Sequence, residues 1–488
     1  MNQLALCSRA RDRARLARQL AAAVFFIGLC ILCEATTAAD DRYNVLFIVA
    51  DDMNTELGCY GHEEVKTPSL DRLCSMGMRF DTAYCQAPLC NPSRVSFLSG
   101  LRPDRTGVYT LSEPTRRRLK DAVMLPQCFK QHGYYTVQSG KIFHTGEGFE
   151  DPASWDVLLP EFGKQPLGSA ILQYKDPPGP VKHCTDWAVL QMADEDMPDG
   201  IVARRAVTFM REAVHEQRPF FLGVGFRRPH APFAVPKKYF DLYPAETTSL
   251  PPAAPPGYAE SILPAALNYD WGPRPLMQEE QRELRAAYFA CNTFVDAQVN
   301  VLWQAMDDLD LWESTIVVFL GDHGYHLGDH GGFWHKQSLF EESCRVPLII
   351  YVPEMRDAGG TCSQIVELVD LYPTLTELCG LTAPVELDGV SLRPLLNGED
   401  LRVKPGAFTT ASRSESRADS SKVAGFLGRS VRTQRWRYTE WDGGKRGREL
   451  YDHHSDPQEL HNVADQPTNK AVVAELRAML EDGRFAAE

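Results

Sequence analysis

Residues 44–52 read Asn-Val-Leu-Phe-Ile-Val-Ala-Asp-Asp, an uninterrupted apolar run that ends in two carboxylates. A run of this length and composition is typical of a strand that is buried on both faces. Comparable runs occur further along the chain, at 134–138, 220–225, 315–320 and 347–352. They alternate with helical patterns, one of which runs through residues 278–306. From Asn44 to about Leu396 the sequence therefore predicts an α/β domain with a largely parallel sheet covered by helices on both faces.

The first 39 residues of the 488-residue chain have the pattern of an export signal. Five arginines precede an apolar run from Leu20 to Cys33, and small residues at 35–39 offer a cleavage site. The apolar run is about 14 residues long, which is short for a membrane span. We therefore expect a signal peptide at 1–39 and an exported protein, periplasmic or extracellular, without a membrane span after cleavage; an uncleaved anchor is the alternative.

Removal of residues 1–39 would leave a chain with a net charge of −17. This acidic balance argues against a nucleic-acid partner, because nucleic acids need a basic surface. It leaves room for an anionic substrate in a small basic pocket. The ten cysteines after residue 39 are scattered and form no Cys-x-x-Cys pair, so they do not predict a zinc site.

The last part of the chain differs from the rest in its pattern. Residues 411–422 are polar, lack large apolar side chains and are predicted to be flexible. Strand patterns at 428–433 and 436–441 and a helix near 469–481 follow. We expect a signal peptide at 1–39, a catalytic domain at 40–405 and a small antiparallel sheet-and-helix subdomain at 406–488. Segments 171–186 and 244–277 are rich in Pro, Gly and polar residues, which predicts long surface loops.

Polar clusters follow four of the predicted strands. They are Asp51-Asp52, Lys141 with His144, Arg227-Arg228-Pro229-His230, and Asp322-His323 with Lys336 further along the same loop. Each cluster alone is weak evidence, since two aspartates after a strand often form a turn or a cap. Because the carboxyl ends of parallel strands meet at one edge of a sheet, however, we expect these side chains to lie together.

Three carboxylates at that edge predict a bound cation, because a buried carboxylate without compensation costs several kcal/mol. Oxygen ligands favour a hard ion, calcium or magnesium. His323 fits this expectation less well, since imidazole suits softer metals.

Residues 89–100 read Leu-Cys-Asn-Pro-Ser-Arg-Val-Ser-Phe-Leu-Ser-Gly. Pro92 suits the first turn of a helix, which would put Cys90 just before the helix N-terminus. Free N–H groups there favour negative charge, so the Cys90 thiol is a candidate nucleophile with a low pKa. A buried structural cysteine is the alternative and would be the more common finding if the motif stood alone.

The Cys-x-Pro-Ser-Arg core at 90–94 resembles the signature of the type I sulfatases, with Asn91 where small residues are more usual. A second signature of that family is similar to residues 133–144, Gly-Tyr-Tyr-Thr-Val-Gln-Ser-Gly-Lys-Ile-Phe-His. Further segments resemble the iduronate-2-sulfatase branch, among them 225–233, 322–331, 346–353, 430–433, 436–439, 449–451 and 455–457. The resemblance implies an alkaline-phosphatase-like fold and a sulfated carbohydrate substrate. It also implies that a formylglycine-generating enzyme converts Cys90 to formylglycine, an aldehyde that hydrates to a gem-diol.

The same resemblance implies one calcium ion per chain, with magnesium as the less favoured ion. The implied metal ligands are Asp51, Asp52, Asp322, His323 and an oxygen of the formylglycine at Cys90. The implied catalytic residues are Cys90, Arg94, Lys141, His144, His230 and Lys336. Arg94 would reach back to the hydrated aldehyde, and the two lysines would hold sulfate oxygens. His230 would protonate the departing sugar oxygen, and His144 would be the base of the second step.

The implied substrate is a 2-O-sulfated uronic acid or another sulfated polysaccharide unit. Tyr325 stands where the human-type enzyme has tryptophan, and Arg429 or Lys422 would have to replace the family's carboxylate-binding lysine. Two alternatives remain open, a phosphonate or phosphodiester hydrolase of the same superfamily and a non-catalytic glycan-binding relative with an unmodified Cys90. Three further histidines are predicted to be structural and to bond loop carbonyls: His326, His330 and His335.

Overall fold

The computed structural model describes residues 42–160, 170–175, 186–267, 276–384, 386–399, 401–414 and 425–482. The predicted signal peptide and most of the segment predicted to be flexible, 411–422, lie outside these residues. Residues 43–488 group into one compact unit, and the predicted boundary between 405 and 406 stays a prediction. No helix in the described ranges is both long and apolar enough to span a membrane.

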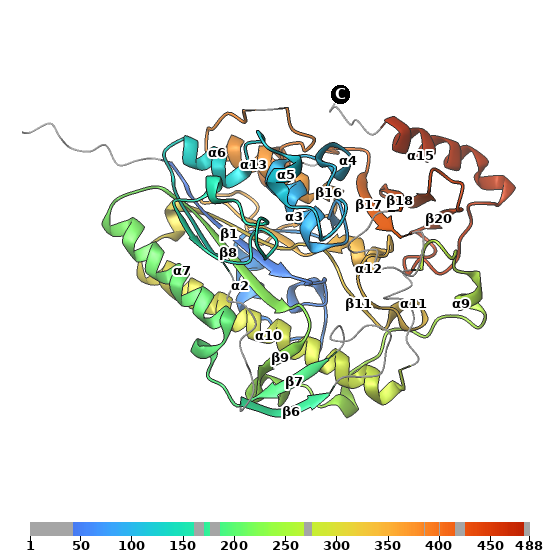
Figure 1. Ribbon diagram of the computed structural model, residues 1–488, viewed down its shortest axis with the longest axis horizontal. Helices are drawn as coiled ribbons and strands as arrows, with labels where there is room; N and C mark the ends of the chain where they lie inside the picture. Colours follow the sequence, from blue (N-terminus) through green and yellow to red (C-terminus); the bar gives the residue numbers. More distant parts are fainter. Residues whose placement is uncertain are drawn as a thin grey trace, which may run out of the picture. The chain divides into compact units, whose positions relative to one another are not determined.

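An eight-stranded sheet in the order β15-β2-β14-β10-β1-β8-β4-β5 forms the centre of the molecule (Figure 1). Its parallel strands are β10 (Thr315–Gly321), β1 (Asn44–Asp51), β8 (Phe220–Pro229), β4 (Tyr135–Gly140) and β5 (Val157–Leu159). Beyond β10 lie β14 (Leu348–Tyr351), β2 (Met78–Phe80) and β15 (Thr361–Cys362), of which β14 runs antiparallel to both of its neighbours. The predicted mostly parallel sheet is confirmed.

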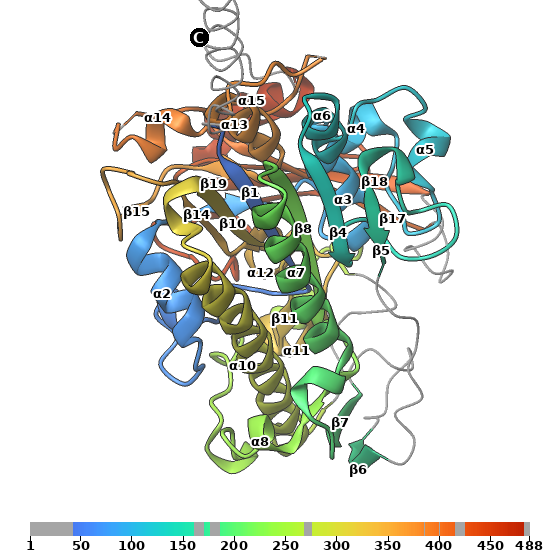
Figure 2. The same ribbon diagram turned by 90° about the vertical axis from the view of Figure 1, so that its left-hand side faces the viewer.

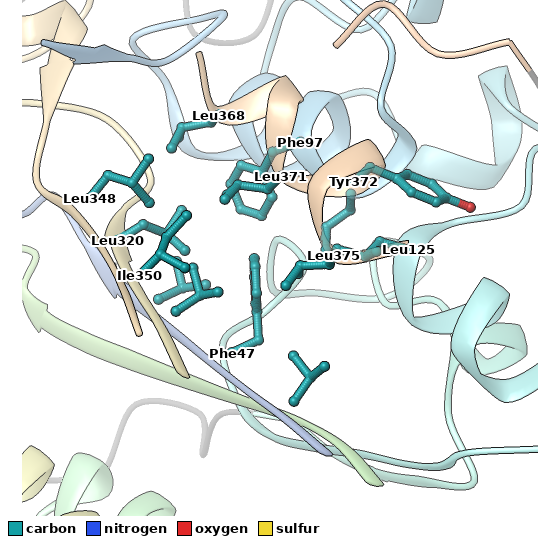
Figure 3. Packing of buried hydrophobic residues seen from close by; sticks show 14 of the residues in the cluster. Phe47, Phe97, Leu125, Leu320, Leu348, Ile350, Leu368, Leu371, Tyr372 and Leu375 are labelled. Carbon is teal, nitrogen blue, oxygen red and sulfur yellow. The ribbon is translucent and has the colours of Figure 1, made fainter. Parts of the chain in front are cut away.

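Side chains of β1 alternate between two buried layers. Val45, Phe47 and Val49 face one layer, and the residues between them face the other. The first layer is covered by α3 (Cys90–Ser99), α6 (Leu125–Gln131) and α13 (Leu371–Leu378). Figure 3 shows its packing around Phe47 and Phe97. The second is covered by α2 (Pro68–Met76), α7 (Pro198–His215) and α10 (Gln278–Asp308), which Figure 2 shows running along the sheet. Each fully buried large apolar side chain contributes roughly 1.5–3 kcal/mol, so the two layers hold the strand ends firmly in place.

A four-stranded antiparallel sheet follows in the C-terminal part, as predicted. Its strands are β17 (Ala407–Arg413), β18 (Phe426–Arg432), β19 (Trp436–Trp441) and β20 (Arg448–Asp452). The helix α15 (Lys470–Asp482) packs on it through Val473 and Leu476. The prediction of a flexible segment is wrong for residues 411–413, which belong to β17. Arg413 is buried there because its guanidinium lies 4.6 Å from the Trp441 ring centroid and donates to the carbonyls of Ala265 and Ala266.

The predicted loop at 171–186 is also wrong in part. Residues 171–175 form β6 (Ile171–Lys175), which pairs antiparallel with β7 (Trp187–Leu190), and β7 pairs with β9 (Phe233–Pro236). Residues 176–185 lie outside the described residues. The segment 244–277 holds η5 (Ala245–Thr247) and α9 (Tyr258–Ser261) where it is described.

The remaining elements are short. They are η1 (Gly58–Tyr60), β3 (Ala83–Tyr84), α4 (Pro103–Thr106), α5 (Thr115–Arg118), η2 (Pro152–Ser154), η4 (Asp194–Asp196), α8 (Lys237–Phe240), η6 (Trp312–Ser314), β11 (His326–Leu327), α11 (Asp329–Gly332), β12 (Trp334–His335), α12 (Glu341–Cys344), β13 (Arg345–Val346), β16 (Val366–Glu367), η7 (Leu368–Asp370), α14 (Arg393–Leu396) and η8 (Pro467–Asn469). Seven of the described cysteines are free thiols: Cys59, Cys74, Cys85, Cys90, Cys128, Cys291 and Cys344.

Candidate active site

The predicted polar clusters meet at the carboxyl edge of the parallel strands. Strand β1 ends in Asp51, and its neighbour β10 is paired so that Ala50 lies opposite Gly321, directly before Asp322. The backbone N–H of Asp52 donates to Asp322 Oδ1 at 3.1 Å. All three aspartates are completely buried. The sheet register therefore brings together carboxylates that are 270 residues apart in the chain.

Helix α3 delivers Cys90 to these carboxylates. It includes Cys90 as its first residue, whereas the motif predicted a start just after Cys90, and all ten of its residues are buried. Cys90 Sγ lies 3.4 Å from His323 Nε2 and 3.1 Å from Lys336 Nζ. Two sets of potential ligand atoms lie within 4.8 Å of one another, and both include Cys90. One set is Asp51, Cys90, Asp322 and His323, and the other is Asp51, Asp52, Cys90 and His230.

Three buried cations pair with the three carboxylates. Arg94 Nε donates to Asp322 Oδ2 at 2.8 Å, and its Nη2 donates to Asp51 Oδ1 at 3.2 Å. Lys141 Nζ forms an ion pair with Asp51, and Lys336 Nζ forms one with Asp52. The negative charges of these carboxylates are therefore compensated by ion pairs within the protein. The sequence-based expectation that they lack compensation is wrong.

A carboxylate oxygen nevertheless remains open in the site. Asp52 Oδ2 is buried and has no hydrogen-bond partner among the described residues. It lies 4.0 Å from His230 Nε2. Burial raises the pKa of Asp52. An open carboxylate oxygen among further carboxylates and an imidazole fits a divalent cation, and the preponderance of oxygen favours a hard one.

The Cys90 thiol does not have the low pKa that its position at a helix N-terminus predicts. Burial and the charge of Asp51 raise the pKa of Cys90 to about 12. By contrast the charges of Lys141 and Arg94 hold the pKa of Asp51 well below the usual value despite its burial. An unmodified Cys90 is therefore a protonated and weakly nucleophilic thiol here.

Both predicted acid–base histidines are neutral. Burial and then Lys336 lower the pKa of His230 well below its usual value, and its Nδ1 hydrogen-bonds with the Ala231 carbonyl at 2.7 Å. Burial and then Lys141 lower the pKa of His144 to about 3. The Nδ1 of His144 has no hydrogen-bond partner in the described part of the chain.

Arg94 has a different set of partners from the one we predicted. Besides the two aspartates, its Nη1 donates to the carbonyls of Lys141 and Ile142. We expected the guanidinium to reach back to residue 90, but its hydrogen bonds hold the carboxylates and the start of the loop after β4. Its contribution is therefore to position the site.

Two supporting residues were not predicted. The Tyr288 hydroxyl donates to the Asp52 carbonyl at 2.7 Å and accepts from the Asn54 N–H at 2.9 Å. These bonds fix the backbone where Asp52 adopts a left-handed conformation with φ of 65°. The Ser93 hydroxyl donates to the Asp322 carbonyl. Ser93 lies inside the recognised motif, but nothing in the sequence marks Tyr288 within its long helix.

Two of the three candidate residues for substrate specificity, Arg429 and Tyr325, are described. Arg429 pairs with Asp104 at 2.6 Å and both side chains are exposed. Lys422 lies outside the described residues. Tyr325 is buried and stacks on Tyr288, with ring centroids 5.6 Å apart.

Comparisons with known proteins agree with this architecture. The family model described as Sulfatase matches residues 43–381, and the model described as N-sulphoglucosamine sulphohydrolase, C-terminal, matches residues 328–485. The chain is 32% identical to iduronate 2-sulfatase of Mus musculus over 94% of this chain and 98% of that protein. It is 28% identical to delta 4,5-hexuronate-2-O-sulfatase of Bacteroides thetaiotaomicron, over 92% of this chain and 90% of that protein.

A solved structure extends the likeness to the fold. The phosphonate monoester hydrolase of Agrobacterium radiobacter superposes with a TM-score of 0.75 at 24% identity, covering 91% of this chain and 95% of that one. The predicted alkaline-phosphatase-like architecture is confirmed. Because the family model covers most of the chain and the curated relative aligns over nearly its whole length, the chain belongs to the sulfatase family.

Proposed function

We propose that this protein hydrolyses the sulfate ester of a 2-O-sulfated uronic acid or a related unit of a sulfated polysaccharide. The observation that carries the proposal is the convergence of Asp51, Asp322 and His323 on Cys90 at one sheet edge. The substrate class follows the two relatives, whose names specify a 2-sulfate on iduronate or hexuronate.

Conversion of Cys90 to formylglycine is part of the proposal, and the state of the thiol supports it. A thiol with a pKa of about 12 is a poor nucleophile, so an unmodified Cys90 would be inert. An aldehyde hydrate carries two hydroxyls on one carbon. The first can attack sulfur and expel the alcohol; loss of the second hydroxyl's proton then re-forms the C=O bond and breaks the C–O bond to sulfate. A thiol or serine has no second hydroxyl and could not be reset in this way.

A divalent cation, calcium by our proposal, would be held by Asp51, Asp52, Asp322 and His323, and when bound it supplies positive charge to a sulfate oxygen and to the oxygen at residue 90. The open oxygen of Asp52 supports this ligand set.

The cationic side chains orient the sulfate group. Lys336 Nζ already lies 3.1 Å from the atom at residue 90 where the nucleophile would stand. Lys141 and Lys336 bind sulfate oxygens as point charges once the carboxylates bind the cation. Arg94 keeps Asp51 and Asp322 in register.

The two histidines move protons. His230 Nε2 is the ring nitrogen that the Ala231 carbonyl does not occupy, so it carries the proton to the departing sugar oxygen. Because His230 is neutral at rest, it must first accept that proton from the attacking hydroxyl. His144, also neutral, is the base that takes the proton from the second hydroxyl.

Assays on defined substrates test the function. Purified protein from a host able to form formylglycine would be incubated with 2-O-sulfated uronate disaccharides, other sulfated disaccharides, aryl sulfates and phosphate or phosphonate esters. The proposal expects the highest kcat/KM on the 2-O-sulfated disaccharide and none for Cys90→Ala. Turnover of aryl sulfates alone would refute the carbohydrate substrate, and faster turnover of phosphonate esters would favour the other hydrolase class. A bound glycan without turnover, with an intact Cys90 thiol, would favour the non-catalytic alternative.

Export is the remaining part of the proposal. It rests on the arginine-rich start and the apolar run of residues 20–33. N-terminal sequencing of the protein recovered outside the cytoplasm should begin near residue 40. Recovery of the full-length chain in the membrane fraction would show an uncleaved anchor instead.

A further inference from the structure

A second group of potential metal ligands lies at the hairpin of β11 and β12. In that hairpin His326 pairs with His335 and Leu327 pairs with Trp334. The segment connects His323 to Lys336, so it carries one active-site residue at each end. Anything that fixes the hairpin therefore also positions both of those residues.

His326, His330 and Glu342 form this group, and each offers one ligand atom within 4.8 Å of the others. His330 Nε2 lies 3.0 Å from Glu342 Oε2, and His326 Nδ1 lies 3.9 Å from the same oxygen. His326 Nδ1 is also 3.8 Å from Asp329 Oδ2. Ligand atoms bound at 2.0–2.2 Å around a tetrahedral ion are separated by about 3.3–3.6 Å, which is close to these distances.

An unpartnered nitrogen points into the group. His326 is 1% exposed, and its Nε2 hydrogen-bonds with the Ser338 hydroxyl at 2.7 Å. Its Nδ1 is buried and has no hydrogen-bond partner in the described ranges. Leaving such an atom unsatisfied costs about 1–3 kcal/mol. In the tautomer whose Nε2–H donates to the Ser338 hydroxyl, Nδ1 offers its lone pair to an ion.

The other imidazole is oriented as a metal ligand would be. The Tyr258 hydroxyl hydrogen-bonds with His330 Nδ1, which turns His330 Nε2 toward Glu342. Ligating histidines in metal sites commonly have such a partner on their second nitrogen. The sequence suggested that these two histidines bond loop carbonyls, and that prediction is wrong. His326 hydrogen-bonds with Ser338, and His330 hydrogen-bonds with Tyr258 and Glu342.

We propose that His326, His330 and Glu342 bind a structural zinc ion, with Asp329 or water as the fourth ligand. Two imidazoles and a carboxylate suit zinc better than calcium, whose ligands are oxygens. A cavity of about 490 Å³ lies next to the group, lined by Gly331, which follows His330 in the chain, and by Tyr258, which hydrogen-bonds with His330. The zinc would pin the hairpin and so hold His323 and Lys336 at the active site.

Metal content of the purified full-length chain tests this site. After saturation with zinc and dialysis, we expect about one zinc per chain at the hairpin. His326→Gln should lose this zinc. Tyr258→Phe should keep the site but weaken its zinc affinity by about 10–100-fold, because only the orienting hydroxyl is removed.

Two control variants separate this site from others. Asp52→Asn alters the active-site ligands, and His453→Gln alters the other described His–carboxylate group, Glu341, His453 and Glu459. Both should retain the hairpin zinc. Unchanged zinc in His326→Gln, or loss of the zinc in either control, would overturn the proposal.

A measurement on the unaltered chain covers the case in which His326→Gln does not fold. A crystal soaked in zinc chloride would be measured at the zinc absorption edge. An anomalous peak between His326 Nδ1 and His330 Nε2 is expected. A map with no peak there, with zinc found elsewhere or nowhere, would refute the site.

Discussion

Two buried ionic clusters of this molecule differ in one respect that separates stability from function. The active-site cluster contains Asp51, Asp52, Asp322, Arg94, Lys141 and Lys336. The C-terminal cluster contains Glu341, Glu459, Arg437 and His453, and it joins α12 to the four-stranded sheet. Both are buried networks of carboxylates and cations that come from distant parts of the chain.

Every carboxylate oxygen of the C-terminal cluster accepts a hydrogen bond. Glu459 Oε1 accepts from Arg437 and contacts His453 Nε2 at 2.7 Å, and its Oε2 accepts from the Glu341 N–H at 2.9 Å. Glu341 accepts from the Tyr84 hydroxyl at 2.9 Å and from Arg437. The pKa of Glu341 is lowered because Arg432 and Arg437 outweigh its burial, and the pKa of Glu459 is lowered because Arg437 does so.

The active-site cluster is not closed in this way. Asp52 Oδ2 has no hydrogen-bond partner among the described residues, and burial raises the pKa of Asp52. A cluster whose hydrogen bonds are all made inside the protein stabilises the fold, whereas an open oxygen is free to bind a ligand. The comparison thus predicts that substitutions in the two clusters affect different properties.

The largest effect should come from Cys90→Ala. Loss of the group that supplies the nucleophile should lower kcat by about 10⁶-fold, while the melting temperature changes little. Cys85→Ala is the matched control, because Cys85 is also buried and its Sγ donates to the Ser343 carbonyl. Measurable sulfatase turnover by Cys90→Ala above background would break the proposed mechanism.

Arg437→Met should destabilise the fold and leave the chemistry intact. It removes a cation that serves both Glu341 and Glu459, and breaking a buried pair in this way costs about 3–5 kcal/mol. Urea unfolding measures this loss, and kcat of the folded protein should be unchanged. Arg435→Met, at an exposed pair with Asp452, should leave stability essentially unchanged. A large fall in kcat for Arg437→Met with normal stability would contradict the comparison.

Asp52→Asn should impair the chemistry and leave the stability of the fold largely intact. The substitution keeps the side-chain shape but removes the charge beside the open oxygen, so cation affinity should fall and kcat should drop by about 10²–10³-fold. Calorimetric titration with calcium gives the affinity, with the exposed Asp241→Asn as control. Calcium binding of normal strength in Asp52→Asn would exclude this carboxylate from the metal site.

The smallest effect is a pH dependence in the C-terminal cluster. The pKa of Glu459 is lowered in the folded state, so its contribution to stability is complete above the ordinary glutamate pKa of about 4.3 and is lost as pH falls below that value. The difference in unfolding free energy between the native chain and Glu459→Gln should therefore shrink as acid is added. If the difference in unfolding free energy grows as the pH falls, the pKa of Glu459 is not lowered in the folded state.

The sheet could be predicted from the sequence because its strands are buried on both faces and read as apolar runs. Strand β1 covers the apolar run that begins at Asn44 and extends to Asp51, the first of the two carboxylates. β6 and the end of β17 were missed because their residues are polar or exposed. Arg413 is charged and stands in a polar stretch, which is typical of a loop. Its cation–π contact with Trp441 depends on the fold and is not visible in the sequence. The antiparallel direction of β14 depends on pairing across the sheet, which a run of apolar residues does not specify.

The sequence was sufficient to predict which residues lie together in the site. It was not sufficient to predict which side chains form ion pairs and hydrogen bonds with each other. Their convergence follows from strand order and motif spacing. The pairing of Lys141 with Asp51 and the hydrogen bonds of Arg94 depend on side-chain geometry across separate loops. Tyr288 supports Asp52 from the middle of α10, where no local pattern distinguishes it from a core residue.

The central claim is that a divalent cation binds the open carboxylates beside an aldehyde made from Cys90. A crystal structure of the matured protein with calcium tests it most directly. We expect oxygens of Asp51, Asp52, Asp322 and residue 90 to lie about 2.3–2.6 Å from one ion. An unmodified thiol at residue 90, with Lys141 and Lys336 still paired to the aspartates in excess calcium, would contradict it.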